Sequence, residues 1–237
     1  MSIRDDYFRI LHRIHRDIGG DVVPFCIEEV HQLFDLLHNL DAEVILQTNR
    51  CHFIMSSLSE MYGCEVAHIV RNFADVWASM ITAPLRKRSW LRPAYRMLRE
   101  GPFGEWVLTR IFPKVGSVGK LFFIEEDFQR LSRRYELPAC RDYLDKMLIV
   151  WAYFNYHAVE QVRSAGGTCI SYESLVRDPD RTLKYLSDRT SVRFEKAIRI
   201  TKREVHFKVS ESYRSRIRKL GLSNMIERIL LHCSILR

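Results

Sequence analysis

The sequence predicts an α/β fold, rich in helix, in which helices pack on a parallel sheet, and two observations carry this prediction. Short β-branched strands alternate with amphipathic helices between residues 43 and 82. A long helix over 141–164 then leads into another short strand at 168–171 and a further helix start. Strands that alternate with helices form parallel sheets with right-handed crossovers. At 237 residues the chain has the length of one such unit, and we expect a single domain over 1–237.

The N-terminal part is expected to hold two helices, over 3–18 and 26–40, because apolar residues recur there at helical spacing. The short apolar run at 44–46 is typical of a buried strand. A third helix is expected over 51–62, and it ends near Gly63, the residue type that most often follows a helix.

The next strand–helix unit is the most informative part of the sequence. The β-branched run from Val66 to Val70 is typical of a central parallel strand, and Asn72 is placed to cap a helix that is expected over residues 73–81. Arg71 therefore lies at the carboxyl edge of the sheet, where open α/β folds bind ligands. Ser79 follows about two turns into the helix. An arginine fork and a serine hydroxyl suit a phosphate.

Residues 83–140 interrupt this alternation with five prolines and many aromatic residues, and we expect a helical insertion over the sheet edge. Such an insertion supplies either a substrate pocket or simply its own aromatic core. After the strand at 168–171, Asp178-Pro179 is expected to start a helix. The tail over 192–237 is expected to be helical.

Composition narrows the classes of function. The net charge of +8 favours an anionic ligand, but the sequence has no nucleic-acid reader motif, so a nucleic-acid partner is not expected. The six cysteines form no CxxC pair and the nine histidines no ligand spacing, so we expect reduced cysteines and no metal. No apolar run approaches the ~20 residues of a membrane span, and residues 1–18 lack a signal-peptide core. We therefore expect a cytoplasmic protein.

The segment from residue 65 to residue 80 resembles the 3′-phosphate-binding motif of the sulfotransferase family, whose donor is 3′-phosphoadenosine 5′-phosphosulfate (PAPS). The family pattern is a strand ending in Val-Arg-Asn, followed by Asp-Val-x-x-Ser, and this sequence keeps it from Val70 to Ser79, with Phe73 where many members have proline. The resemblance implies that Arg71 and Ser79 hold the 3′-phosphate of the nucleotide. It also implies a three-layer parallel sheet of the P-loop nucleoside-kinase-like type.

A second block, over residues 141–187, strengthens the resemblance. Sulfotransferases commonly carry a long helix with Trp and Asn, a strand, a Tyr-Glu-Asp-Leu-like turn and an Asp-Pro helix start. The matching residues here are Trp151, Asn155, Tyr172 to Leu175, Asp178 and Pro179. The resemblance implies that Tyr172 lies against the adenine. The competing interpretation is a tyrosine that covers the core at the end of a strand.

The first strand, phosphate loop and helix of the family are missing, since residues 1–42 contain no strand followed by a basic glycine-containing loop. The segment Gly116–Lys120 only partly matches a phosphate loop, because its spacing is incomplete. Gln47 stands where members have lysine, in Gln47-Thr48-Asn49-Arg50. We expect Thr48 and Arg50 to line the donor pocket, and no catalytic base is assigned.

The resemblance implies transfer of a sulfuryl group from PAPS to a hydroxyl or amine acceptor, without a metal. Three explanations of the missing loop remain open: a fragment, a degenerate relative, or a site completed by another chain, as in a homo-oligomer or with a different partner. The rival function is a non-catalytic nucleotide-binding or interaction module derived from the same fold. A basic nucleic-acid-binding protein is the least favoured reading.

Overall fold

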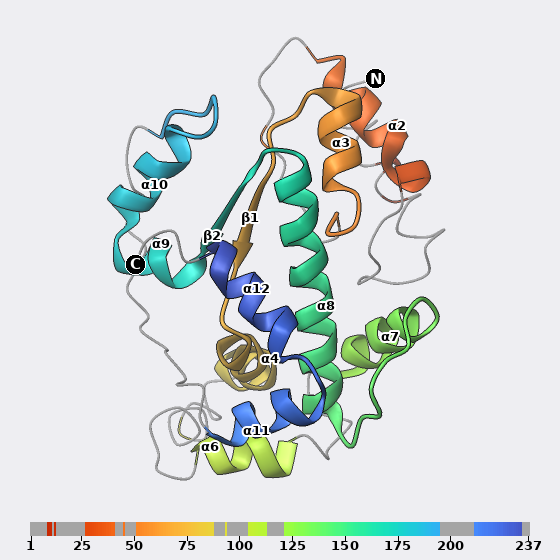
Figure 1. Ribbon diagram of the computed structural model, residues 1–237, viewed down its shortest axis with the longest axis vertical. Coiled ribbons are helices and arrows are strands. Elements are labelled where there is room, and N and C mark those ends of the chain that lie inside the picture. Colours follow the sequence, from red (N-terminus) through yellow and green to blue (C-terminus); the bar gives the residue numbers. More distant parts are fainter. Residues whose placement is uncertain are drawn as a thin grey trace.

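The structure is a computed structural model of the chain, and it describes residues 9, 10, 12, 27–40, 45, 51–87, 93, 104–112, 121–194 and 211–233. Within these residues helices predominate, and the β structure is one sheet of two parallel strands (Figure 1). The prediction of a helix-rich α/β chain with parallel strands is confirmed at this level. The strand expected at 44–46 lies outside the described residues except for Ile45, which is not in a strand and is 78% exposed.

The sheet joins the two strands that the sequence predicts. Strand β1, Ala67–Val70, pairs in parallel with strand β2, Thr168–Ser171. The register places Ala67 opposite Thr168 and Val70 opposite Ser171, so the strands end level with one another. The residue that follows each strand therefore leaves the sheet at the same edge.

Helix α8, Tyr143–Ser164, is the largest element on the sheet and runs alongside both strands (Figure 1). The side chain of Asp142 caps it by accepting a hydrogen bond from the backbone N–H of Asp145 over 3.1 Å. The spacing of the sequence predicts seven residues on its core side, of which Phe154 and Asn155 are only half-buried. The other five are buried, and they are Leu144, Met147, Leu148, Trp151 and Ala158.

Gly167 sets the close approach between the end of α8 and the start of the sheet. A Cβ atom at Gly167 would lie 2.3 Å from the carbonyl oxygen of Val66. The backbone N–H of the next residue, Thr168, donates to that same carbonyl over 3.1 Å. Only glycine allows the chain to enter β2 this close to β1.

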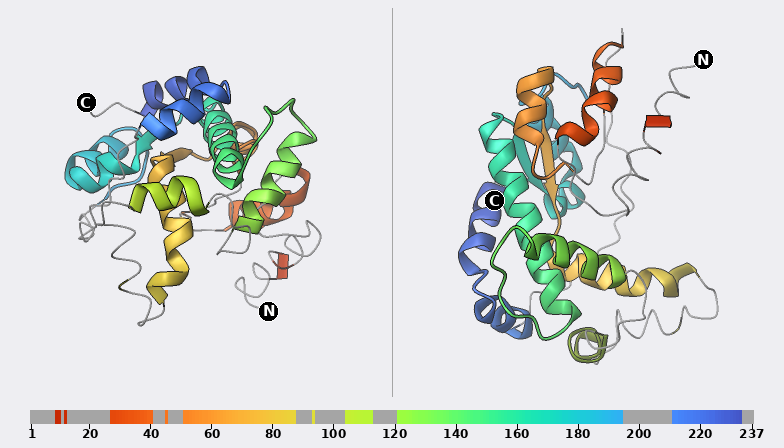
Figure 2. Two further views of the ribbon diagram at one scale, coloured as in Figure 1. Left: turned by 90° about the horizontal axis from the view of Figure 1, so that it is seen from below. Right: turned by 90° about the vertical axis from the view of Figure 1, so that its right-hand side faces the viewer.

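Two of the three helices predicted before the sheet are confirmed, and the helix expected over 3–18 lies outside the described residues except for residues 9, 10 and 12. Helix α2 covers Ile27–His38 and helix α3 covers Met55–Tyr62, and α3 ends at Gly63, which has a left-handed φ of 62°. Helix α4, Phe73–Lys87, leads away from the sheet at a steep angle to α8 (Figure 2). It is longer than the expected 73–81 and continues past Pro84, so this proline does not end the helix.

The described parts of the expected insertion are helical up to Ser132, and residues 133–140 form a turn and irregular chain. Helix α6, Gly104–Trp106, continues into η2, Val107–Ile111, which has the wider π-helical hydrogen bonding, and helix α7 covers Leu121–Ser132. Helix α7 packs against α8, where Lys146 and Glu125 form an ion pair.

The chain after β2 is helical from its first residue. Residues Tyr172–Arg177 form the short helix α9, so the turn that the resemblance to sulfotransferases implies there was wrong. The physical reason is a cap, because the hydroxyl of Ser171 accepts from the backbone N–H of Ser174 over 3.0 Å. Helix α10, Pro179–Ser187, begins with proline after an Asp178 cap, as expected.

The expected helical tail is confirmed over two segments, whereas residues 192–194 are irregular. Helix α11, Glu211–Lys219, and helix α12, Ser223–Cys233, are separated by a break at Gly221, whose φ is 68°. Helix α12 lies against α8 and β2 (Figure 1). No helix among the described residues is both long enough and apolar enough to cross a membrane.

Candidate functional site

Arg71 and Tyr172 meet at the carboxyl edge of the sheet. The guanidinium carbon of Arg71 lies 4.9 Å from the centre of the Tyr172 ring. This contact follows from the register, because each residue comes directly after the last paired residue of its strand. A cation over a tyrosine face at this distance is attracted by the ring quadrupole. Two of the predicted site residues, 101 positions apart in sequence, are thus brought together.

The backbone at Arg71 is fixed from the side of α8. The indole N–H of Trp151 donates to the carbonyl oxygen of Arg71 over 3.0 Å. Trp151 is buried, and its ring packs edge-on against Phe73, with 5.6 Å between the ring centres. The strand end, the first residue of α4 and the long helix therefore hold one another in place.

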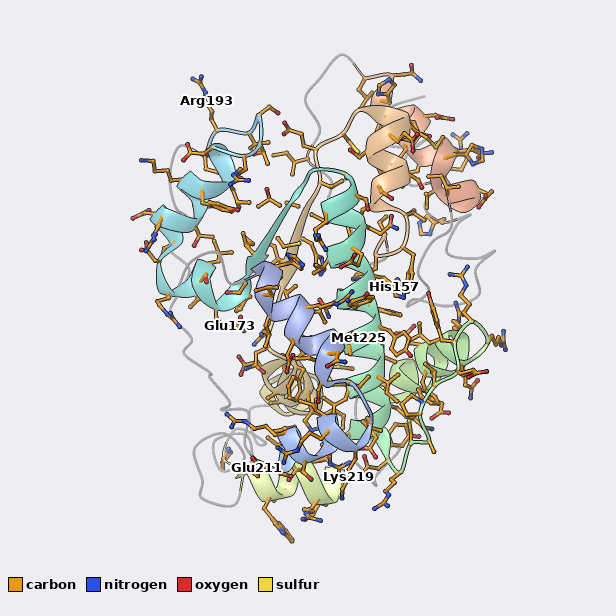
Figure 3. All side chains as sticks on the ribbon, in the orientation of Figure 1. His157, Glu173, Arg193, Glu211, Lys219 and Met225 are labelled. Carbon is orange, nitrogen blue, oxygen red and sulfur yellow. The ribbon has the colours of Figure 1, made fainter. Side chains whose placement is uncertain are left out.

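Glu173, on helix α9 directly after β2, holds the link between β1 and α4 in place. Its carboxylate accepts a hydrogen bond from the backbone N–H of Asn72 over 2.8 Å. Figure 3 shows Glu173 on α9, close to the end of β2. Asn72 in turn caps α4, because its side-chain oxygen accepts from the backbone N–H of Ala74 over 2.8 Å. A carboxylate at this helix N-terminus also complements the helix dipole.

The guanidinium of Arg71 has a donor that the fold leaves unused. Its Nε atom is buried and finds no hydrogen-bond partner among the described residues. A buried donor without an acceptor costs roughly 1–3 kcal/mol, and more when the group is charged. An anion bound beside Arg71 would supply the acceptor. This observation supports an oxyanion ligand at the site.

Ser79 lies on α4 and is half-buried. It shares a helix face with Asn72, which is seven residues earlier, and lies roughly 10 Å along the helix from it at 1.5 Å per residue. A ligand that contacts both Arg71 and Ser79 must therefore bridge part of the ~10 Å between the start of α4 and Ser79. The long arginine side chain and a phosphate between the two are suited to this geometry.

The remaining site residues of the sequence prediction lie outside the described part of the chain. They are Thr48 and Arg50, together with Gln47 and the segment Gly116–Lys120. Their predicted roles stay predictions.

Two histidines that sequence reasoning did not single out lie at strand β1: His68 is part of the strand, and His52 contacts it. His68 on β1 shares a hydrogen bond of 3.0 Å between its Nε2 and the side-chain oxygen of Asn155 on α8. The ring of His52 lies edge-on to His68, with 5.8 Å between the ring centres. Burial, with a smaller effect of His68, lowers the pKa of His52 to about 3. Burial also lowers the pKa of His68.

These histidines form a neutral pair rather than a base for catalysis near neutral pH, because an imidazole with so low a pKa is a weak proton acceptor. Among the described residues, no group of three or more His, Cys, Asp or Glu side chains is arranged to hold a metal ion. Alternation along the strand would place the apolar Ile69 inside and His68 outside, but Ile69 is 49% exposed and His68 faces α8, so no local signal in the sequence predicted this histidine pair.

Comparison with known proteins places the chain in a family. It is 37% identical over 230 residues to a protein of Archaeoglobus fulgidus described as uncharacterized, and the match covers 90% of this chain and 73% of that protein. The chain belongs to the same family as this archaeal protein. No protein-family model matches the chain. No solved structure matches it.

Proposed function

We propose that the chain is a sulfotransferase-like protein that binds a 3′-phosphoadenosine nucleotide at the carboxyl edge of β1 and β2. The observation that carries this proposal is the contact between Arg71 and Tyr172, with the Nε donor of Arg71 buried and without a partner among the described residues. A cationic fork beside an aromatic ring suits a ligand that has both a phosphate and a base.

In this proposal Arg71 and Ser79 hold the 3′-phosphate, and Tyr172 faces the adenine. Glu173 and Trp151 are positioning residues, because they bind the N–H and the C=O of the peptide group that joins Arg71 to Asn72. The two strands are the centre of a larger three-layer sheet of the P-loop nucleoside-kinase-like type. The proposal assigns Thr48 and Arg50, which lie outside the described residues, to the donor side of the site.

The chemistry proposed for the completed site is transfer of the sulfuryl group of PAPS to a hydroxyl or amine acceptor. The attacking oxygen or nitrogen and the leaving phosphate oxygen stand in line, and charge neutralisation and positioning carry most of the catalysis. In this proposal Arg71, Ser79 and Tyr172 bind the nucleotide, and the insertion over 83–140 meets the acceptor.

A non-catalytic nucleotide-binding module is the second candidate, and a specific observation favours it. Gln47 stands in place of the family lysine, and a neutral amide stabilises developing negative charge less than an ammonium group. Both candidates predict the same nucleotide site and differ only in turnover.

The test compares two nucleotides by isothermal titration calorimetry. The proposal predicts tighter binding of 3′-phosphoadenosine 5′-phosphate than of 5′-AMP, because only the former engages Arg71 and Ser79. Arg71→Ala should remove most of the difference, which is about 1.5–3 kcal/mol for a charged hydrogen-bonded group. The matched control is Arg133→Ala, an exposed arginine that follows α7. Equal affinity of the unmodified protein for both nucleotides would refute the site.

A further inference from the structure

The π-helical turn η2 brings a tryptophan, an arginine and an isoleucine onto one face. The hydrogen bonds of a π-helix join residues five apart, so residues four and five positions apart share a face. Arg110 and Ile111 therefore lie on the same face as Trp106, the residue that precedes η2. In an α-helix, with 3.6 residues per turn, Ile111 would point about 140° away from Trp106. We call these three residues the Trp106 face.

The Trp106 face is exposed, whereas the opposite side of η2 is buried. Trp106 is 57% exposed and Ile111 is 41% exposed, and Arg110 is exposed as well. On the opposite side, Leu108 is 0% exposed and Thr109 is 3% exposed. Apolar side chains that stay in solvent side by side, with charged residues at their rim, mark an interaction site.

Neighbouring helices hold the buried side of η2 in place. The indole N–H of Trp77, on α4, donates to the carbonyl oxygen of Leu108 over 2.9 Å. The guanidinium of Arg216, on α11, donates to the carbonyl oxygen of Thr109 over 3.2 Å. The Trp106 face therefore has a fixed support, and α11 lies directly beside its segment (Figure 1).

Helix α11 adds positive charge beside the Trp106 face. Its exposed charged residues are Glu211, Arg214, Arg218 and Lys219, and Glu211 pairs with Arg218. Figure 3 shows Glu211 and Lys219 at the two ends of α11. Within the part of the chain that the structure describes, Arg110, Arg214 and Lys219 form no ion pair. Three cations without an acidic partner among these residues thus surround the exposed indole.

We propose that the Trp106 face, with Arg214 and Lys219 beside it, binds the surface of an anionic lipid bilayer. Tryptophan is favoured at the boundary between headgroups and acyl chains, and basic side chains are attracted to anionic headgroups. A protein partner suits the face less well, because a stable protein interface buries roughly 800 Å² on each side, far more than two apolar side chains supply. A bilayer accepts shallow insertion and needs no complementary shape.

The test sediments the native full chain with vesicles of phosphatidylcholine, either alone or with about 30% phosphatidylserine. The expected result is binding to the anionic vesicles, several-fold weaker binding to the neutral ones, and loss of binding in high salt because salt screens exposed charges. No binding to anionic vesicles would overturn the proposal. Because the assay contains no nucleotide, its result is independent of the proposed function.

Variants assign the binding to the Trp106 face. Trp106→Ala should weaken binding to anionic vesicles about tenfold, because a large apolar side chain no longer enters the bilayer. Arg214→Gln and Lys219→Gln should each weaken it about fivefold. The matched controls are Met61→Ala, at a residue of α3 that is also 57% exposed, and Arg133→Gln, at an exposed arginine after α7. Both should bind like the unmodified protein.

Two further outcomes would contradict the assignment. Equal losses in the control variants would show that total charge or apolar content, and not the Trp106 face, governs binding. A dimer in analytical ultracentrifugation that Trp106→Ala dissociates, without vesicle binding, would show that a second copy of the chain covers this face. The substituted residues are all exposed, so the variants are expected to fold.

Discussion

The indole N–H of Trp151 donates to the carbonyl oxygen of Arg71 over 3.0 Å, which ties the long helix α8 to the end of strand β1. The two residues are 80 positions apart in the sequence. The bond satisfies the backbone oxygen of the residue that we place on the nucleotide phosphate, and it fixes the level at which that residue leaves the sheet. Substitutions at Trp151 therefore test both stability and binding.

Trp151→Phe should keep the aromatic packing on Phe73 but remove the hydrogen bond. Because the carbonyl of Arg71 is then left without this donor, we expect a loss of about 1–3 kcal/mol in the free energy of unfolding, measured by urea denaturation. The affinity for 3′-phosphoadenosine 5′-phosphate should fall as well. Trp106→Phe, at a tryptophan that is 57% exposed, is the control and should change neither quantity.

Arg216 should be one of the most costly residues to remove, because it joins three separate elements. Its guanidinium pairs with Asp142 and Asp145 at the start of α8 and donates to the carbonyl of Thr109 over 3.2 Å. Arg216→Ala leaves the buried Asp145 carboxylate without its cation, so we expect about 3–5 kcal/mol of destabilisation.

Arg218, on the same helix, provides the comparison for Arg216. Arg218 pairs with Glu211 on the protein surface, where both side chains are more than 60% exposed. Arg218→Ala should cost about 0–1 kcal/mol in the same denaturation experiment. A similar loss for both variants would show that burial of the Arg216 cluster does not control its contribution.

The free energy of unfolding should fall as the pH is lowered, because His52 and His68 are buried as neutral side chains in the folded protein. Burial lowers both pKa values in the folded protein, that of His52 from 6.5 to about 3, so the unfolded chain binds more protons between these limits. The stability from His52 is complete above about pH 6.5 and is lost as the pH falls toward 3. One such group contributes a slope of up to about 1.4 kcal/mol per pH unit.

The measurement is urea denaturation between pH 7 and pH 4 on the unmodified protein and on His52→Phe. Phenylalanine keeps an aromatic ring beside Phe154 and does not titrate, so the variant should lose less stability over this window. His38→Gln, at an exposed histidine, should keep the slope of the unmodified protein. Parallel slopes for all three proteins would refute the assignment.

Gly167→Ala should separate the two strands at their starting end. The added methyl group would lie 2.3 Å from the carbonyl oxygen of Val66, so the backbone must shift. We expect this shift to lower the free energy of unfolding by about 1–3 kcal/mol or more. Gly63→Ala is the matched control, because its Cβ would meet nothing within 4 Å and only the left-handed φ is strained. That strain costs about 1–2 kcal/mol. Thermal unfolding of both variants gives the comparison.

Local signals predicted the elements that depend on neighbouring residues. The β-branched run before Arg71, the Asn72 cap and the Asp178-Pro179 helix start were all readable from the sequence, and the structure has them. Helix α9 was missed because a four-residue motif reads equally as a turn, and the deciding hydrogen bond comes from the hydroxyl of Ser171.

Contacts between distant segments were beyond the reach of local signals. The ion pair between Arg216 and Asp145 joins residues 71 positions apart, and no local pattern around either residue predicts the pairing. The parallel pairing of β1 and β2 was an exception, because the order of strands and helices restricts it. The register that places Arg71 against Tyr172 needs the structure, since a shift of one residue would reverse the side of each side chain.

The level ends of the two strands also have a kinetic consequence. The Arg71 and Tyr172 sides of the candidate site are joined by a crossover that runs from Arg71 to Gly167, so neither side can recognise a ligand before that whole stretch is in place. Long-range pairing of this kind forms late, because the chain must first close a large loop. Ligand capture during refolding should therefore appear only with the last, slowest phase, and a nucleotide added early should leave the preceding phases unchanged.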